Sequence, residues 1–134
     1  MKILALDLGD KWVGSAISDA LGITCRPYKT ITVENMVSFL KKVISEENLS
    51  KIVLGYPKTI KGTESEQTQK TKGVKAELEK IFPKIEWIFW DERLTSKRAD
   101  QIMRRGKKDK LGEHSIAAAF ILQSYLDHLA FLKS

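Results

Sequence analysis

The stretch that most constrains the fold is a short apolar run near the start of the chain that carries a single acid. Residues Ile3 to Leu8 read ILALDL, a composition typical of a β-strand buried on both faces. An ionised carboxylate inside such a strand costs several kcal/mol unless it is paired. We therefore expect Asp7 at the exposed end of the strand, where Gly9 and Asp10 turn the chain into a second strand.

An aspartate at the carboxyl end of a sheet strand has two common uses. It can ligate a hard cation such as magnesium, or it can accept hydrogen bonds from backbone N–H groups of the turn that follows. The Asp-x-Gly pattern alone favours the second use. Other parts of the chain must decide what Asp7 does.

The rest of the pattern predicts one α/β domain, residues 1–134, built on a five-stranded mixed sheet with flanking helices. Three antiparallel strands come first, and Pro27 places the third of them at an edge. Two strands that run parallel to the first follow, after crossover helices. The expected strands are 3–8, 12–18, 23–31, 51–55 and 85–90; the expected helices are 32–48, 74–82, 95–105 and 113 onward; loops are expected over 56–73 and 106–112.

Acids follow two of the three parallel strands. The carboxyl ends of parallel strands open on one edge of a sheet, where α/β folds place their ligands. Asp7, the Gly55–Pro57 turn and the pair Asp91 and Glu92 are all expected on that edge. Because neighbouring residues of a strand point to opposite faces, only one acid of the pair can face Asp7 without a bulge.

Composition limits the class of protein. The single cysteine, Cys25, excludes an intramolecular disulfide, and its neighbours favour a reduced structural thiol. We see no apolar run of the roughly 20 residues that span a membrane and no signal peptide. These features predict a soluble cytoplasmic protein, not a membrane protein. We also expect a monomer or a weak homodimer.

The basic residues are concentrated in one segment. Residues 93–110 contain eight basic and two acidic side chains, which equals the net charge of +6 of the whole chain. A basic run is most often a solvated surface, but this concentration favours a polyanionic partner, with nucleic acid first. The candidate contacts are Lys11, Arg93, Arg104, Arg105, Lys107 and Lys108.

Four blocks of the sequence carry a resemblance to a known family. They read DLGDKWVGSAISD, GYPKTIKGTES, WDERLTS and HSIAAAFILQSYL, in this order along the chain. Together they resemble the YqgF (RuvX) family of pre-16S rRNA nucleases, which are related to Holliday-junction resolvases. The resemblance implies a ribonuclease-H-like fold, hydrolysis of a phosphodiester, and one or two divalent ions, Mg²⁺ or Mn²⁺. It places catalytic, metal-binding acids at Asp7 and Glu92.

The chain departs from that family at the start of the last helix. Family members usually have an aspartate there, whereas this chain has His114. Imidazole can ligate a divalent ion or relay protons, so we expect His114 as the third catalytic and metal-binding residue. Glu113 is the alternative if the helix begins in a different register, and His114 could also be only an interfacial residue.

Three function classes follow. The first is a metal-dependent nuclease, with precursor rRNA or branched DNA as the nucleic-acid partner. The second is an ATP-binding phosphotransferase, suggested by the DLG turn and Gly14, although such enzymes enclose their nucleotide between two domains. The third is a non-catalytic nucleic-acid-binding assembly factor. Nothing in the sequence identifies a reader of the RNA 2′-hydroxyl, so RNA and DNA both remain open.

Overall fold

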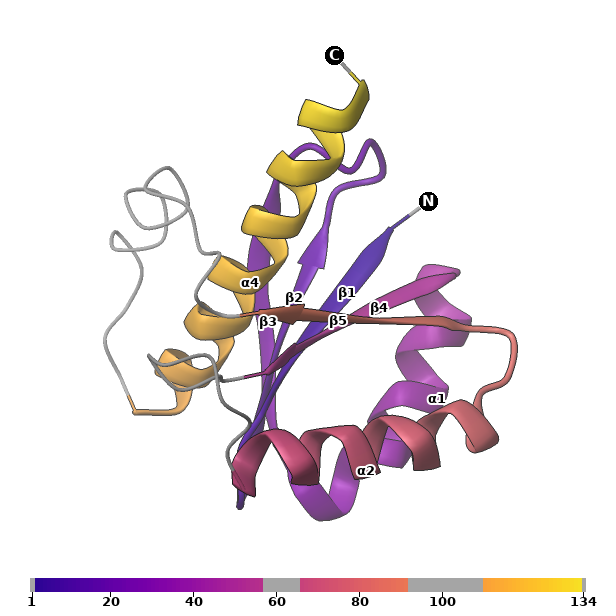
Figure 1. The fold of residues 1–134 in the computed structure, drawn as a ribbon, viewed down its shortest axis with the longest axis vertical. Helices are drawn as coiled ribbons and strands as arrows, with labels where there is room; N and C mark the ends of the chain where they lie inside the picture. Colours follow the sequence, from indigo (N-terminus) through magenta and orange to yellow (C-terminus); the bar gives the residue numbers. More distant parts are fainter. Residues whose placement is uncertain (1, 57–65, 92–109, 134) are drawn as a thin grey trace.

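The computed structural model describes residues 2–56, 66–91 and 110–133. Its centre is a five-stranded sheet in the order β3-β2-β1-β4-β5. The strands are β1 (Ile3–Leu8), β2 (Trp12–Ser18), β3 (Cys25–Thr32), β4 (Lys51–Tyr56) and β5 (Glu86–Asp91), and the helices are the 3₁₀ turn η1 (Val33–Asn35), α1 (Met36–Glu47), α2 (Glu66–Ile81) and α4 (Lys110–Lys133). Figure 1 shows α4 on one side of the sheet and α1 and α2 on the other.

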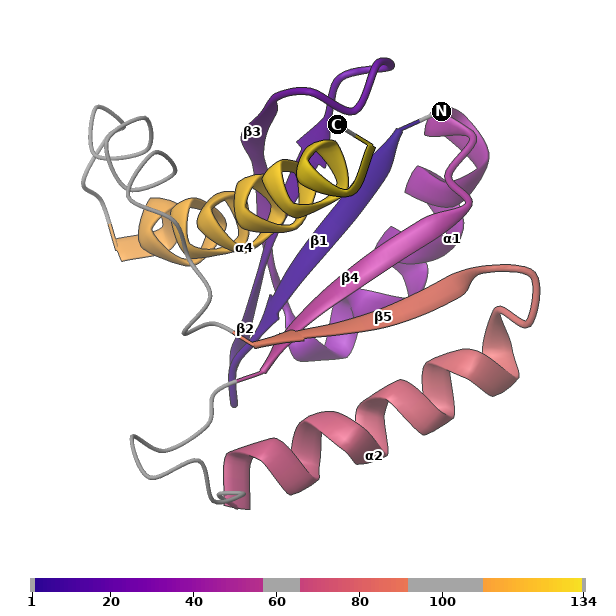
Figure 2. The ribbon, with the colours of Figure 1, turned by 45° about the horizontal axis from the view of Figure 1, so that its top comes forward.

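Strand directions agree with the expected mixed sheet. β1 pairs antiparallel with β2 and β2 antiparallel with β3, whereas β1–β4 and β4–β5 are parallel. Helices on both sides of the sheet cover the central strand β1. Its residues from Ile3 to Leu6 are accordingly all apolar and buried. Figure 2 shows α4 lying across β3, β2 and β1, the strands on which it mainly packs.

Each face of the sheet has its own core. On the α1/α2 face, leucines and isoleucines of the three inner strands meet Leu40, Val43 and Leu78. On the α4 face, the small residues Ala5 and Ala16 meet Ala118 and Ala119. Small side chains on both sides let α4 lie close to the sheet. The start of this helix packs near the carboxyl end of β1.

Most predicted elements are confirmed, with shifts at their ends. β3 is an edge strand and holds Pro27, as expected. The helix predicted from residue 74 begins earlier, at Glu66, so the second half of the expected loop 56–73 is helical. The last helix likewise begins at Lys110, three residues before the predicted start. The added residues of α2 are polar and lack an apolar stripe, and those of α4 include Gly112, which is typical of a loop. Both continue a helix whose buried part lies further along the chain.

Some predicted segments lie outside the described residues: the helix 95–105, residues 106–109 of the expected loop 106–112, and residues 57–65 of the expected loop 56–73.

One helix is apolar enough to be compared with a membrane span. Of the described residues, His114–Lys133 is long and apolar enough to cross a membrane by length and composition, which the sequence patterns had not led us to expect. Half of this stretch is buried in the protein. Its apolar side chains Leu122, Tyr125 and Leu126 pack on the sheet as part of the α4-side core, which explains the composition without a membrane.

Candidate functional site

Asp7 lies at the carboxyl end of β1, on the face of the sheet that α4 covers. Its Cα partners are Gly14 of β2 and Gly55 of β4, and paired residues of neighbouring strands share a face. The Asp7 side chain is half-buried and is thus flanked on both sides by residues without side chains. The space that side chains at these two positions would take is occupied by the backbone of α4 and by the side chain of Ile121.

Gly14 brings the last helix against this end of the sheet. A Cβ atom on Gly14 would collide with the carbonyl oxygen of His114 and would lie 2.7 Å from the backbone nitrogen of Ser115. Only glycine permits this close approach of helix and strand. Gly55 has the same effect in β4, where a Cβ atom would collide with the side chain of Ile121.

His114 therefore sits on the same face and at the same end of the sheet as Asp7. It lies one turn into α4, and its ring atom Cε1 is 3.9 Å from the position that a Cβ atom on Gly9 would occupy. Gly9 is two residues beyond Asp7 and points to the same face. The fold thus brings together an acid and an imidazole that are 107 positions apart in the sequence.

The start of α4 is also fixed by hydrogen bonds to the edge strand β3. The hydroxyl oxygens of Thr30 and Ser115 are 2.6 Å apart, and the Cys25 thiol donates to the carbonyl oxygen of Ala119 over 3.3 Å. Burial, with a smaller contribution from the charge of Asp127, raises the pKa of Cys25 to about 12. The cysteine is therefore a protonated structural thiol, as expected from the sequence.

The turn after β1 does not use the Asp7 carboxylate. It is closed by a backbone hydrogen bond of 3.0 Å from Gly9 N–H to the carbonyl oxygen of Trp12. No residue in the described part of the chain donates a hydrogen bond to the Asp7 side chain. This geometry favours the ligand interpretation of Asp7 over the structural one.

The register of β5 assigns a face to its last residue, Asp91. Trp90 pairs with Gly55, in the row of Asp7, whereas Asp91 pairs with Tyr56 in the next row. Asp91 thus belongs to the opposite face, which packs against α1 and α2, and it is buried. Glu92 lies outside the described residues.

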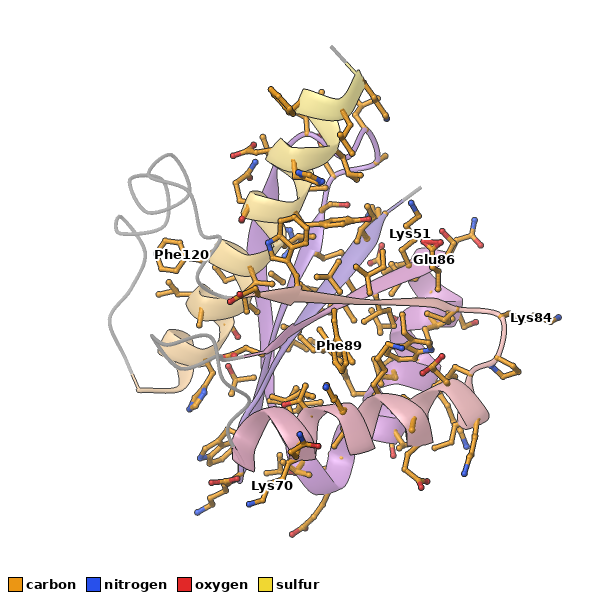
Figure 3. All side chains as sticks on the ribbon, in the orientation of Figure 1. Lys51, Lys70, Lys84, Glu86, Phe89 and Phe120 are labelled. Atoms are coloured by element: carbon orange, nitrogen blue, oxygen red, sulfur yellow. The ribbon has the colours of Figure 1, made fainter. Side chains whose placement is uncertain are left out.

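The predicted nucleic-acid contacts are only partly described. Lys11 is exposed in the β1–β2 turn, and its Nζ lies 5.6 Å from the ring centroid of Trp12. Its neighbour Asp10 pairs with Lys70 of α2, with an N–O distance of 3.7 Å, and Figure 3 shows Lys70 on the outer side of that helix. The predicted contacts Arg93, Arg104, Arg105, Lys107 and Lys108 lie outside the described residues.

A divalent cation fits the donors at this end of the sheet, although no group of three acids, histidines or cysteines occurs among the described side chains. Asp7 supplies oxygen, which magnesium and manganese both accept, and His114 supplies nitrogen, which suits manganese better. Gly14 and Gly55 let α4, and with it His114, lie against the end of the sheet that carries the carboxylate. The sequence analysis did not assign these two glycines a role; their positions opposite Asp7 in a paired register would have indicated one.

Comparison with known proteins identifies the family of this chain. A family model described as RuvX, Holliday junction resolvase, matches residues 1–128. A protein from Sulfurihydrogenibium sp. that carries the name "Putative pre-16S rRNA nuclease" is 42% identical over 136 residues, which cover 97% of this chain and 92% of that protein. A protein of the same name from Clostridium tetani is 42% identical over 139 residues, covering 95% and 96%.

The fold is also found among solved structures. The structure of Thermus thermophilus RuvC in complex with a Holliday junction substrate matches with a TM-score of 0.64 at 12% identity, over 97% of this chain and 96% of that one. A second Thermus thermophilus RuvC structure matches with a TM-score of 0.61 at 9% identity, over 96% of both chains. These likenesses confirm the predicted ribonuclease-H-like fold.

Proposed function

This chain belongs to the RuvX family of Holliday junction resolvases, and on that premise we propose that it is a metal-dependent nuclease that processes the 5′ end of pre-16S rRNA. It is a hydrolase of nucleic-acid ester bonds. The relatives that carry the name pre-16S rRNA nuclease match over nearly the full length of the chain. The protein would act in the cytoplasm, as a monomer or a weak homodimer.

One observation supports this function most strongly. Asp7 stands between two glycines on the face of the sheet that the first turns of α4 cover, and His114 of that helix lies beside Gly9. The carboxylate is not used by the turn that follows it. A purely structural aspartate does not need the nearby imidazole.

Glu92 is the second acid of the proposed site. If the alternation of β5 continued for one more residue, position 92 would share the face of Asp7, which favours Glu92 over Asp91 as the second acid. We therefore propose Asp7, Glu92 and His114 as the residues that hold one or two ions, Mg²⁺ or Mn²⁺, with Glu113 as the alternative to His114.

The bound ions would supply charge stabilisation and an activated water molecule for attack on phosphorus. The chain's own residues have separate tasks. Asp7 would hold its charge next to the scissile phosphate, and the glycines beside it would keep α4 and His114 close to it. Lys11 and Arg93 would neutralise neighbouring phosphates of the strand, and the basic segment around Arg104, Arg105, Lys107 and Lys108 would attract the nucleic acid from a distance.

A Holliday-junction-like DNA activity is the second candidate. It is favoured by the description of the matching family model. Both functions use the same site, and they differ only in the nucleic acid that reaches it.

A direct comparison of substrates tests the proposal. The full chain is incubated with a precursor rRNA fragment that contains the mature 5′ end of 16S rRNA, and separately with a four-way DNA junction, each with magnesium or manganese. We expect metal-dependent cleavage of the RNA near the mature end, abolished by EDTA. Cleavage of the junction alone would replace the RNA function with the DNA function, and cleavage of neither would exclude the nuclease.

A further inference from the structure

Trp12 differs from the other two tryptophans in what it contacts. Trp87 and Trp90 both belong to the cores, and their indole N–H groups donate to the carbonyl oxygen of Phe82 and to the hydroxyl of Ser124. Trp12 is half-buried, yet it belongs to neither core. Within the described ranges, no acceptor takes its indole N–H. Among the described residues, Trp12 therefore lacks the core packing and the hydrogen bond that usually explain a large aromatic side chain.

The register places Trp12 beside the candidate site. Val13 packs in the α1/α2-side core, so Trp12 and Gly14 point to the opposite face, where α4 lies. Across the turn, Trp12 faces Gly9, whose own N–H donates to the Trp12 carbonyl oxygen. Gly9 is in turn the residue next to the His114 ring. The indole thus starts two rows beyond Asp7 and Gly14, on the same face.

A cation accompanies the indole. The Lys11 Nζ lies over the Trp12 ring at 5.6 Å from its centroid, and the Lys11 side chain is exposed. An aromatic face with a lysine beside it is the combination that single-stranded nucleic acids use, because a base stacks on the ring while the ammonium contacts a neighbouring phosphate. Stacking on a single ring requires a base whose own faces are not covered by neighbours in a duplex.

We propose that Trp12 is a stacking platform for an unpaired nucleobase next to the Asp7–His114 site. This inference rests on the proposed nuclease function and deepens it. The substrate is then a nucleic acid with a single-stranded segment at the cleaved bond, and the enzyme reads the absence of pairing there and not a base sequence. Trp12 binds and orients the strand; it does not take part in the chemical step.

Binding without cleavage tests the platform. A 12-nucleotide single strand is titrated into the full chain in EDTA, for the wild type, Trp12→Phe and Trp12→Leu. Phenylalanine keeps a stacking face, whereas leucine keeps only apolar bulk. We expect Trp12→Leu to weaken binding by about fivefold or more and Trp12→Phe to weaken it much less. Equal melting temperatures of the three proteins would show that the fold is preserved.

An abasic scan locates the base that stacks. Single abasic sites are moved along the strand, which removes one base and keeps every phosphate. The wild type should lose affinity at one position, and Trp12→Leu should be insensitive at that same position. The dependence of affinity on salt should be equal in the two proteins, because no phosphate contact is lost, whereas Lys11→Gln should lower the slope by about 0.7. Identical abasic profiles for wild type and Trp12→Leu would overturn the inference.

A second readout covers the case in which Trp12→Leu does not fold. The emission of the wild type minus that of Trp12→Phe reports on Trp12 alone. This difference should be quenched by the intact strand and not by the strand that is abasic at the stacking position; equal quenching by both would overturn the platform. Cleavage of precursor rRNA by the wild type, measured separately, decides the nuclease function, so the two claims can fail independently.

Discussion

Burial beneath α4 changes the pKa of one side chain, the thiol of Cys25. Its thiol is half-buried beneath the helix, where it donates to Ala119. Burial first, and then the charge of Asp127, raises its pKa from 9.0 to about 12. The folded protein therefore holds this proton at a pH where the unfolded chain has released it.

The free energy of unfolding should consequently fall in mild alkali. Between about pH 9 and pH 12 the unfolded state binds fewer protons at Cys25 than the folded state, so stability decreases with rising pH, by at most about 1.4 kcal/mol per pH unit. Urea titrations of the wild type and Cys25→Ala between pH 8 and 10 measure the difference. Below pH 10 the raised pKa of Tyr125 contributes little, and parallel curves for the two proteins would contradict the prediction.

His114 stands where the resemblance to the family predicts an aspartate. An imidazole nitrogen in place of a carboxylate oxygen should make the site prefer manganese, because magnesium favours oxygen ligands and retains its waters. We expect His114→Asp to shift the ratio of cleavage rates toward magnesium, and His114→Ala to lower the apparent metal affinity. Rates are compared in both metals beside Glu113→Gln. If only Glu113→Gln changes the metal response, Glu113 is the ligand.

At the scale of elements, the contact between β2 and α4 positions the site. It depends on Gly14, because the His114 carbonyl oxygen occupies the space of a side chain there. The helix cannot move away locally without losing the Thr30–Ser115 hydrogen bond of 2.6 Å. The geometry of His114 relative to Asp7 is thus set by backbone packing and not by flexible side chains.

Gly14→Ala should therefore destabilise the protein and displace His114. The added methyl group collides with backbone, so we expect a loss of about 1–3 kcal/mol in the free energy of unfolding. Gly73→Ala on α2 is the matched control: nothing lies within 4 Å of the added Cβ, and a helical Gly→Ala change should stabilise by about 0.5–1 kcal/mol. Equal effects of the two substitutions in thermal melts would show that the β2–α4 contact is not tight.

The basic segment 93–110 is expected to bind nucleic acid through its combined charge. Replacing Arg104, Arg105, Lys107 and Lys108 by Gln should weaken binding of every nucleic-acid sequence and lower the slope of log affinity against log salt by roughly 0.7–0.9 per lost phosphate contact. The control replaces four exposed lysines of the α1/α2 side: Lys41, Lys42, Lys80 and Lys84. If both quadruple variants changed the slope equally, the effect would be one of net charge and not of this segment.

At the scale of the whole molecule, the order and direction of the strands were predictable because they follow from strong local patterns. Buried runs such as Ile52–Leu54 and turn residues such as Gly9 and Gly22 determine them. The starts of α2 and α4 were not predictable, because the first turns of α2 are polar without a periodic signal and the first turn of α4 contains Gly112, which favours a loop. Asp7 and His114 were found by residue type and resemblance, and the register then placed them on one face.

What the sequence could not provide was the packing around those residues. That Gly14 admits α4, that Thr30 holds Ser115 and that Trp12 belongs to neither core are consequences of register and of contacts between distant segments. Such contacts depend on where α4 lies across the sheet, which no local pattern encodes.

The most direct test of the proposed nuclease is Asp7→Asn. The amide keeps the shape of the side chain between Gly14 and Gly55 but removes the charge, so cleavage of the precursor rRNA fragment should fall by a factor of about 100 or more. Asp10→Asn, at an exposed position paired only loosely with Lys70, is the matched control and should cleave like the wild type. Binding of the uncut fragment and the melting temperature should be the same for all three proteins. Cleavage by Asp7→Asn at the wild-type rate would contradict the site proposed here.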